Sequence, residues 1–178
     1  KRSALTALQA QFRTRETGKT YAALVPGTWP APLKVIDVPL HKYLDAAGER
    51  RVRTAAADEG QRSITLVKVA ERLAGHSLLE VTIKTGRTHQ IRVHLAQAGY
   101  PIVGDDKYGD FALNRRLARG EALPGLRFDR MFLHAQALRF EHPATGQALA
   151  LHAALPAECR ALVDALRPTA TASDEGRS

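Results

Sequence analysis

The chain has 178 residues, of which 44% are hydrophobic and 25% charged, a balance typical of one globular domain and not of a wholly disordered chain. Its 26 lysines and arginines outnumber its 18 acidic residues, which gives a formal net charge of +8. This charge predicts a polyanionic partner, with nucleic acid ahead of an acidic membrane surface. Aromatic residues make up only 6%, too few for a surface that binds single strands mainly by base stacking.

Several protein classes are disfavoured by motifs that the sequence does not contain. No run approaches the roughly 18 consecutive apolar residues of a spanning helix, and no signal-like apolar region opens the chain. The single cysteine, Cys159, excludes an internal disulfide and any zinc site with several thiolates. Neither a GxGxxG motif nor a Walker phosphate loop is present, which disfavours dinucleotide and nucleoside-triphosphate enzymes. We therefore expect a cytoplasmic protein with no membrane attachment.

The first third of the sequence predicts one helix and two strands. Apolar residues recur every three or four positions over residues 3–15, which indicates an amphipathic helix. β-rich runs predict strands over residues 20–25 and 33–40. Residues 45–62 are polar, small and basic, and they predict a surface loop.

The remaining pattern predicts an α+β fold with a mixed, largely antiparallel sheet. A hairpin is indicated by two β-rich runs, over residues 63–71 and 76–84, around a turn that contains Gly75. The later elements are a helix over 88–98, a short helix and loop over 110–130, a hairpin of strands over 131–140 and 148–154, and a helix over 157–166.

Basic and titratable side chains are concentrated in the segment KTGRTHQIRVH, residues 84–94. No carboxylate occurs between residues 81 and 104, so the segment is locally cationic. On the predicted helix, Ile91 and Leu95 mark the core face, and Arg92 lies close to it. An arginine there requires a fixed anionic partner, because an unpaired charge near a core is costly. A structural salt bridge beside a solvated basic face is the alternative to a functional role.

Other chemistries have weak support. His89 and His94 are five residues apart, about 140° around a helix, so they do not share a face as metal ligands would. No GxSxG elbow is present for serine catalysis, and Cys159, in a predicted surface helix, is expected to be inert. We expect no metal and no cofactor.

The segment GRTHQIRVHL at residues 86–95, followed by GYPIVGD at 99–105 and YG at 108–109, resembles the signature of the RluA-type RNA pseudouridine synthases. The sequence KTY at residues 19–21 is similar to the family's K-x-Y strand motif, and LHA at 133–135 to its later L-H-A segment. The resemblance extends from residue 1 to about residue 166. Within the family, the chain is most similar to the RluC group, which acts on large-subunit ribosomal RNA.

This resemblance implies a fold, a reaction and a domain boundary. The fold would be the pseudouridine synthase fold, with flanking helices and a cleft across the sheet. The reaction would isomerise selected uridines to pseudouridine in ribosomal RNA, without cofactor or metal, after the base is flipped into the cleft. Flipping costs a few kcal/mol, which basic contacts to the RNA backbone can offset. The catalytic domain would span residues 1–167, and residues 168–178 would be a disordered tail.

The resemblance also assigns site residues. Tyr21 matches the active-site tyrosine that packs against the target base and is placed for proton transfer, although a core strand tyrosine is the alternative. Arg92 matches the arginine that pairs with the catalytic aspartate. The candidate substrate-binding residues are Lys19, Arg87, His89, Gln90 and Leu133.

The sequence departs from the family at its nucleophile. The family's aspartate lies in an H-R-L-D-x-x-T-S-G loop before the K-x-Y strand, and this sequence contains no such loop. Asp45, in HKYLD, is rejected because its motif has an extra residue and follows Tyr21. Asp105 and Asp106 are expected to be turn residues. We therefore expect a catalytic-domain fragment that begins after the loop, cannot catalyse alone and leaves Arg92 without its family partner.

Two alternatives to an enzyme stay open. The first is a non-catalytic RNA-binding module of the same fold. The second is a basic interaction protein that does not bind RNA, for which RNA affinity would show little salt dependence. If the chain binds RNA, as an enzyme or as a non-catalytic module, Arg50, Arg51 and Arg53 in the predicted loop are expected to strengthen the binding.

Overall fold

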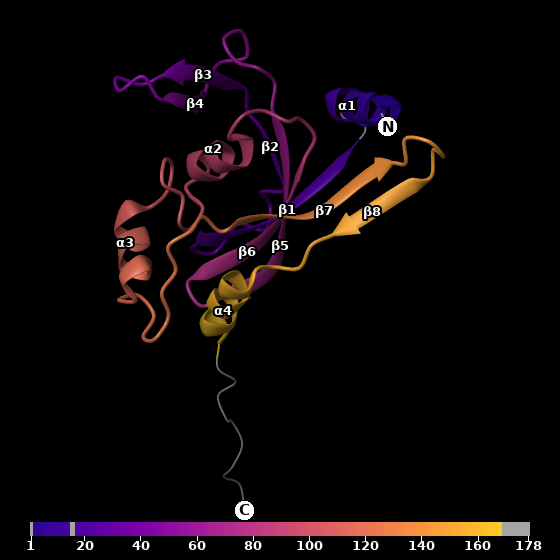
Figure 1. Ribbon diagram of the computed structural model, residues 1–178. Coiled ribbons are helices and arrows are strands. Elements are labelled where there is room, and N and C mark those ends of the chain that lie inside the picture. Colours follow the sequence, from indigo (N-terminus) through magenta and orange to yellow (C-terminus); the bar gives the residue numbers. More distant parts are fainter. Residues whose placement is uncertain (1, 15–16, 169–178) are drawn as a thin grey trace, which may run out of the picture.

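The computed structural model describes residues 2–14 and 17–168, and Figure 1 shows how their helices and strands are arranged. The predicted disordered tail lies outside the described residues from residue 169 onward. None of the described helices is long and apolar enough to cross a membrane. The elements in chain order are α1 (Arg2–Thr14), β1 (Gly18–Pro26), β2 (Val35–Asp37), β3 (Leu40–Leu44), β4 (Arg50–Thr54), β5 (Ile64–Leu73), β6 (His76–Ile83), α2 (Gln90–Gln97), α3 (Phe111–Arg119), β7 (Leu133–Glu141), β8 (Ala148–His152) and α4 (Ala157–Leu166).

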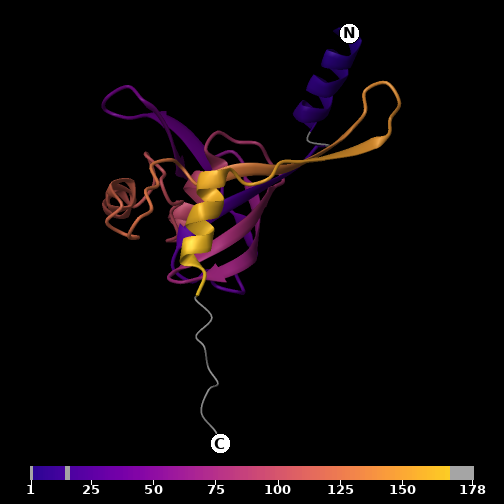
Figure 2. The same cartoon turned by 60° about the horizontal axis from the view of Figure 1, so that its bottom comes forward.

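A six-stranded sheet with the order β2-β5-β6-β1-β7-β8 forms the centre of the described structure. Each of its strand pairings is antiparallel, which confirms the α+β prediction, and no described pairing is parallel. The β7–β8 hairpin projects from the rest of the sheet with α1 beside it (Figure 2). Gln11 of α1 fixes this contact, because its side-chain amide both donates to and accepts from the backbone of Glu141.

The core is built around β1, which lies between β6 and β7. Its residues 22–25 (AALV) are buried on both faces, so this part of the strand is a continuous apolar run. The chain packs closely here. The backbone N–H of Leu24 donates to the carbonyl of Phe132, and the carbonyl of Leu24 accepts from the N–H of Val103. Tyr21 and Lys19 precede this run, at the end of β1 that is only partly buried. The core therefore fixes the strand that carries both candidate residues.

The predicted loop over residues 45–62 is wrong in its first part. Residues 40–54 form a separate two-stranded hairpin, β3–β4, and the strand predicted over 33–40 shrinks to β2. Leu40 and Val52 point into a small apolar cluster with Val93 of α2. The two strands lack the alternation of apolar and polar residues that marks a strand, because each has only one buried residue.

Helix α4 has the predicted boundaries but is not a surface helix on the side of its cysteine. Cys159 is only 1% exposed and packs in the core with Leu162 and Val163. Burial raises the pKa of its thiol, so the thiol stays protonated at neutral pH. The expected inertness of Cys159 thus has a physical cause in burial.

Candidate functional site

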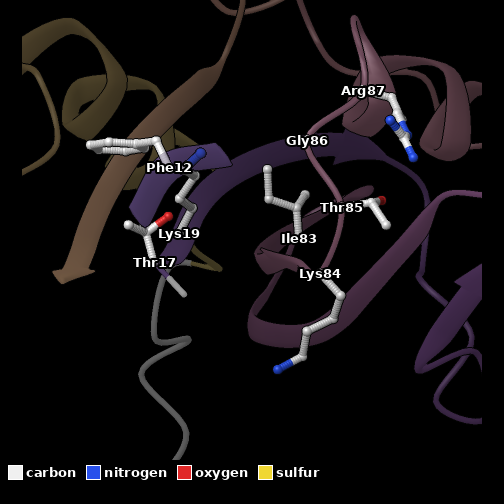
Figure 3. A pocket seen from close by; sticks show the side chains of 8 residues that line it. All are labelled: Phe12, Thr17, Lys19, Ile83, Lys84, Thr85, Gly86 and Arg87. Atoms are coloured by element: carbon white, nitrogen blue, oxygen red, sulfur yellow. The ribbon is translucent and has the colours of Figure 1, made fainter. Parts of the chain in front are cut away.

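A cavity of about 270 Å³ lies where α1, β1 and the segment after β6 meet (Figure 3). Its lining includes three cations and no carboxylate. Figure 3 shows Lys19 beside Phe12 on one side of the cavity and Arg87 on the other. The buried hydroxyl of Thr17 has no hydrogen-bond partner among the described residues. The lining residues are Phe12, Thr17, Lys19, Ile83, Lys84, Thr85, Gly86 and Arg87.

This lining suits an anionic, hydrogen-bonding occupant. The ammonium of Lys19 lies 4.8 Å from the centre of the Phe12 ring, a cation–π contact that orients the lysine. Arg87 donates through Nε to the carbonyl of Arg62, 3.3 Å away, which leaves its other guanidinium nitrogens available. A phosphate can meet such cations and a hydroxyl at once. Two of the predicted substrate-binding residues, Lys19 and Arg87, therefore share one pocket.

Gln90 lies beneath this pocket and fixes the shape of its wall. Its side-chain carbonyl accepts from the hydroxyl of Thr85 at 2.7 Å and from the backbone N–H of Arg87 at 3.1 Å. Its amide donates to the carbonyl of Ile64 at 2.9 Å and to the hydroxyl of Thr65 at 3.0 Å. Gln90 is only 3% exposed. Gln90 was a candidate substrate-binding residue, but its burial gives it a different role, in which it positions the loop that carries Arg87.

His94 extends the same network one turn further along α2. Its Nε2 lies 2.9 Å from the carbonyl of Val38 and its Nδ1 lies 2.8 Å from the hydroxyl of Thr65. Burial lowers the pKa of this fully buried imidazole, which is therefore neutral. Because a carbonyl only accepts, Nε2 carries the proton and Nδ1 accepts from Thr65. The four-residue spacing of Gln90 and His94, which places both on one helix face, is the sequence signal for this network.

Replacing Gln90 with leucine should destabilise the chain by roughly 2–4 kcal/mol, because several buried partners of the amide are left unpaired. Gln97→Leu is the matched control, since Gln97 is exposed and accepts a hydrogen bond only from Thr54 among the contacts described. The measurement is the free energy of unfolding in urea. Equal losses in the two variants would contradict the role assigned to Gln90.

Arg92 has its fixed anionic partner within the chain. Its Nε and Nη2 bind the two carboxylate oxygens of Asp105 at 2.8 and 2.6 Å, and Nη2 also binds Asp106 at 2.8 Å. The Arg92 side chain is 12% exposed and that of Asp105 is fully buried. The requirement for an anion near the core is thus confirmed. The anion is Asp105, which the turn after α2 brings to Arg92, whereas the absence of the family's loop aspartate stays an expectation.

Asp105 is also a turn residue, as the sequence predicted. Its Oδ1 accepts the backbone N–H groups of Lys107 and Tyr108 at 2.8 and 2.9 Å. Burial alone would raise the pKa of this carboxyl, but the hydrogen bonds from Arg92, Tyr108 and Lys107 together hold it below its usual range. Asp105 is therefore an ionised group with all its capacity committed to this turn and to Arg92.

His89 and Arg92 both contact Tyr108. His89 precedes the first residue of α2 and adopts a left-handed backbone conformation, with φ of 52°. Burial and the nearby cations of Arg92 and Lys107 lower the pKa of its imidazole. In the sequence, Tyr108 stands out only as part of the YG segment of the family signature. Its sequence context gave no sign that it contacts both residues, because the contacts span 16 to 19 positions.

Tyr21 and Leu133 lie on one face of the sheet. Tyr21 pairs with Ala135 across β1 and β7, and Leu133 pairs with Ala23 two positions further along. Lys19 is on the same side of β1, two residues before Tyr21, so this face leads to the pocket. Burial raises the pKa of the Tyr21 phenol. Neither Tyr21 nor Leu133 lines the pocket, and both pack against the core.

The β3–β4 hairpin is a second basic surface beside the motif. A groove of about 530 Å³ runs along it and reaches Thr88. Its lining includes Lys42, Arg50 and Arg51. The hairpin arginines, far from the motif in sequence, are therefore close to it in space. Figure 1 shows β3 and β4 next to α2.

Asp45 closes the hairpin turn and is not free to react. One carboxylate oxygen accepts the backbone N–H groups of Ala47 and Glu49, and the other binds Nε of Arg51 at 2.6 Å. The Arg51 contact, followed by the bond from Glu49, lowers the pKa of Asp45. This arrangement supports its rejection as the nucleophile. Among the described residues, no cluster of three or more His, Cys, Asp or Glu side chains could hold a metal ion.

Comparisons with known proteins identify relatives of this chain. Two curated relatives, each named ribosomal large subunit pseudouridine synthase C, come from Salmonella typhi and Escherichia coli K12. Both are 44% identical to this chain, over 96% and 94% of its length, and the matches cover 51% and 50% of the relatives. The chain therefore spans about half the length of these curated relatives.

Solved structures of related proteins share this fold, and a family match covers more than half of the chain. The human RNA pseudouridylate synthase domain containing 4 is 26% identical, with a TM-score of 0.68 over 90% of this chain and 66% of that protein. A second human protein, RNA pseudouridylate synthase domain containing 1, shares the fold with a TM-score of 0.67 at 24% identity. The RNA pseudouridylate synthase family matches residues 1–97, which is more than half of the chain. The chain thus belongs to the RNA pseudouridylate synthase family.

Proposed function

We propose that residues 1–167 form most of the catalytic domain of an enzyme that converts uridine to pseudouridine in large-subunit ribosomal RNA. The observation that carries this proposal is the cation-lined pocket, which lies at the end of the sheet face that bears Tyr21. The names of the relatives from Salmonella typhi and Escherichia coli support the large subunit as the substrate. A ribosomal RNA substrate supports a cytoplasmic location for the enzyme.

The reaction is an isomerisation and needs no cofactor. The bond between uracil N1 and ribose C1′ breaks, the base turns, and C5 joins C1′ while its hydrogen leaves as a proton and N1 gains one. Tyr21 would pack against the flipped base, and its raised pKa keeps the phenol protonated at neutral pH, so that it can hold or pass a proton. Leu133, on the same face, would supply apolar contact to the base.

The nucleophilic aspartate would come from a segment outside these 178 residues. Asp45 is committed to its turn and Asp105 to Arg92 and the 105–108 turn, which leaves both poorly suited to attack. Arg92 uses Nε and Nη2 for its two carboxylate partners. Its Nη1, which has no hydrogen bond in the described contacts, is the nitrogen that would meet the incoming aspartate.

RNA would be held mainly through its phosphates. Lys19, Lys84 and Arg87 surround the pocket, and the β3–β4 hairpin adds further cations near Thr88. Phosphate contacts of this kind release counterions, so affinity should fall steeply with added salt. The same contacts would offset the cost of extruding the base from the RNA.

A non-catalytic RNA-binding module is the second candidate, and one observation favours it. The ion pair of Arg92 with Asp105 is complete within the chain, so the fold does not depend on an aspartate from elsewhere. Such a module would keep the basic pocket and the hairpin. It would bind RNA with strong salt dependence and leave every uridine unchanged.

The test uses the extended protein, defined as this chain joined to the segment that carries the H-R-L-D loop. Large-subunit and small-subunit ribosomal RNA transcripts are incubated with it, and nucleosides are then separated and quantified. Pseudouridine in the large-subunit transcript alone is the expected result. Binding without modification would favour the RNA-binding module, and RNA affinity that ignores salt would favour a protein that does not act on RNA.

A further inference from the structure

Tyr108 lies at the junction of the basic hairpin and helix α2. Its backbone is held by the Asp105 carboxylate, which accepts the Tyr108 N–H at 2.9 Å. The same turn is tied to α3, because Asn114 donates to the carbonyl of Asp105 and accepts from the N–H of Gly104. The ring therefore projects from a rigid turn, and its position does not depend on its own contacts alone.

The hydroxyl of Tyr108 joins the hairpin to the start of α2. It accepts the backbone N–H of Val52 at 2.9 Å and lies 2.9 Å from Nδ1 of His89. Among the described strands, β4 has one neighbour, β3, so the N–H groups on its other side need partners from elsewhere. The phenol supplies one. The left-handed backbone of His89, unfavourable for a residue with a Cβ, is held by this contact.

Two further contacts hold the hairpin against the same turn. Arg51 donates through Nη1 to the carbonyl of Lys107 at 3.3 Å, and the ammonium of Lys107 binds Glu49 at 2.9 Å. Val52 and Leu40 also pack with Tyr108 in the small apolar cluster. The hairpin is thus docked onto residues 105–108.

The ring of Tyr108 contacts the guanidinium of Arg92. The Arg92 Cζ lies 5.1 Å from the centre of the ring, and the His89 ring meets it edge-on at 5.6 Å. Arg92 is therefore oriented on one side by the carboxylates of Asp105 and Asp106 and on another by an aromatic face. One side chain touches the hairpin, His89 and Arg92.

We propose that Tyr108 is a positioning residue that holds the basic β3–β4 hairpin and the Arg92 guanidinium in one fixed arrangement, so that RNA bound by the hairpin is aligned with Arg92. The inference rests on the proposed function for its catalytic part. The hydroxyl of Tyr108 fixes the hairpin and His89, and its ring fixes Arg92.

Two substitutions separate the role of the hydroxyl from that of the ring. Tyr108→Phe keeps the ring and removes the hydroxyl, so the KM of the extended protein for RNA should rise roughly tenfold, as expected for lost hydrogen bonds, with kcat almost unchanged. Tyr108→Leu also removes the aromatic face, so kcat should fall by about tenfold or more as Arg92 loses its orientation. Tyr100→Phe is the matched control, because Tyr100 packs against Trp29 away from this junction.

A second measurement does not depend on catalysis. Hydrogen exchange of the Val52 amide in the 178-residue chain should be faster in Tyr108→Phe than in the unmodified chain, while amides in β5 and β6 keep their rates. An unchanged KM with unchanged Val52 exchange would overturn the proposal. The proposal would also be overturned if kcat fell equally in Tyr108→Phe and Tyr108→Leu, in proportion to the stability that each variant loses. Tyr108 would then have only a structural role. If the unmodified extended protein forms no pseudouridine, the proposed function fails. Hydrogen exchange at Val52 and the RNA affinity of the variants would still show whether Tyr108 holds the hairpin.

Discussion

Replacing Arg92 with alanine should abolish pseudouridine formation by the extended protein and leave most of its RNA affinity. In the proposed reaction the guanidinium meets the incoming aspartate, whereas RNA phosphates would be met by the pocket and the hairpin. The substitution also leaves the buried carboxylate of Asp105 without its cation, which costs about 3–5 kcal/mol for a broken buried pair. Loss of activity must therefore be separated from loss of folding.

The double variant Arg92→Met with Asp105→Asn makes this separation. An asparagine at 105 is uncharged, and its side-chain oxygen can still accept the N–H groups of Lys107 and Tyr108. The double variant should recover much of the stability lost in Arg92→Ala while remaining inactive. Turnover at the unmodified rate in either variant would show that Arg92 does not serve the reaction.

The same ion pair predicts how stability depends on pH. The folded-state pKa of Asp105 lies below its usual range, so the ionised group contributes stability at neutral pH that is lost as pH falls through this pKa. Without Arg92, burial dominates and the pKa of Asp105 rises. In Arg92→Ala the ionised carboxylate is a penalty that protonation relieves, so the stability deficit of this variant relative to the unmodified chain should be largest at neutral pH and shrink as pH falls, as measured by unfolding free energies between about pH 3 and 7. Identical pH profiles would contradict the contribution of this pair.

Replacing Arg50 and Arg53 with alanine should weaken RNA binding by the 178-residue chain. Both side chains are exposed on β4, and Arg53 stacks over Tyr43 at 5.9 Å. The slope of log affinity against log salt is negative, and each lost phosphate contact makes it shallower by about 0.7–0.9. The double variant should therefore make it shallower by up to about 2. Fluorescence anisotropy with an RNA hairpin at several salt concentrations measures this slope.

A control with the same change in net charge is Arg139→Ala with Arg160→Ala, because both are exposed on β7 and α4, away from the hairpin. The control should change the slope much less. Equal effects would mean that net charge, and not the hairpin, determines the affinity. Arg51 is better left intact, since it is bound to Asp45 and to the carbonyl of Lys107, and its loss would loosen the hairpin itself.

Local sequence patterns predicted most of the elements. The two hairpins of the large sheet and α4 occur where turn residues and periodicity placed them. The β3–β4 hairpin was missed because its apolar positions, Leu40 and Val52, are few, and their cluster is completed by Val93 of a distant helix. A pattern read along one segment does not contain that partner.

The site could be predicted in its residues but not in their partners. The need of Arg92 for an anion followed from its place near the core, yet Asp105 could be identified only once the chain had turned back after α2. Gln90 is a candidate substrate-binding residue because it lies in the motif. Its burial depends on Thr65 and Ile64, about 25 residues earlier, which no local spacing reveals.

Release of tritium from 5-tritiated uridine in large-subunit ribosomal RNA tests the central claim most directly, because the C5 hydrogen leaves only when C5 bonds to the ribose. The 178-residue chain, the extended protein and the extended protein with its loop aspartate changed to asparagine are compared. We predict release by the extended protein alone. Release by the 178-residue chain would contradict the account, because a carboxylate within these residues would then perform the attack, and release by none of the three would leave an RNA-binding module.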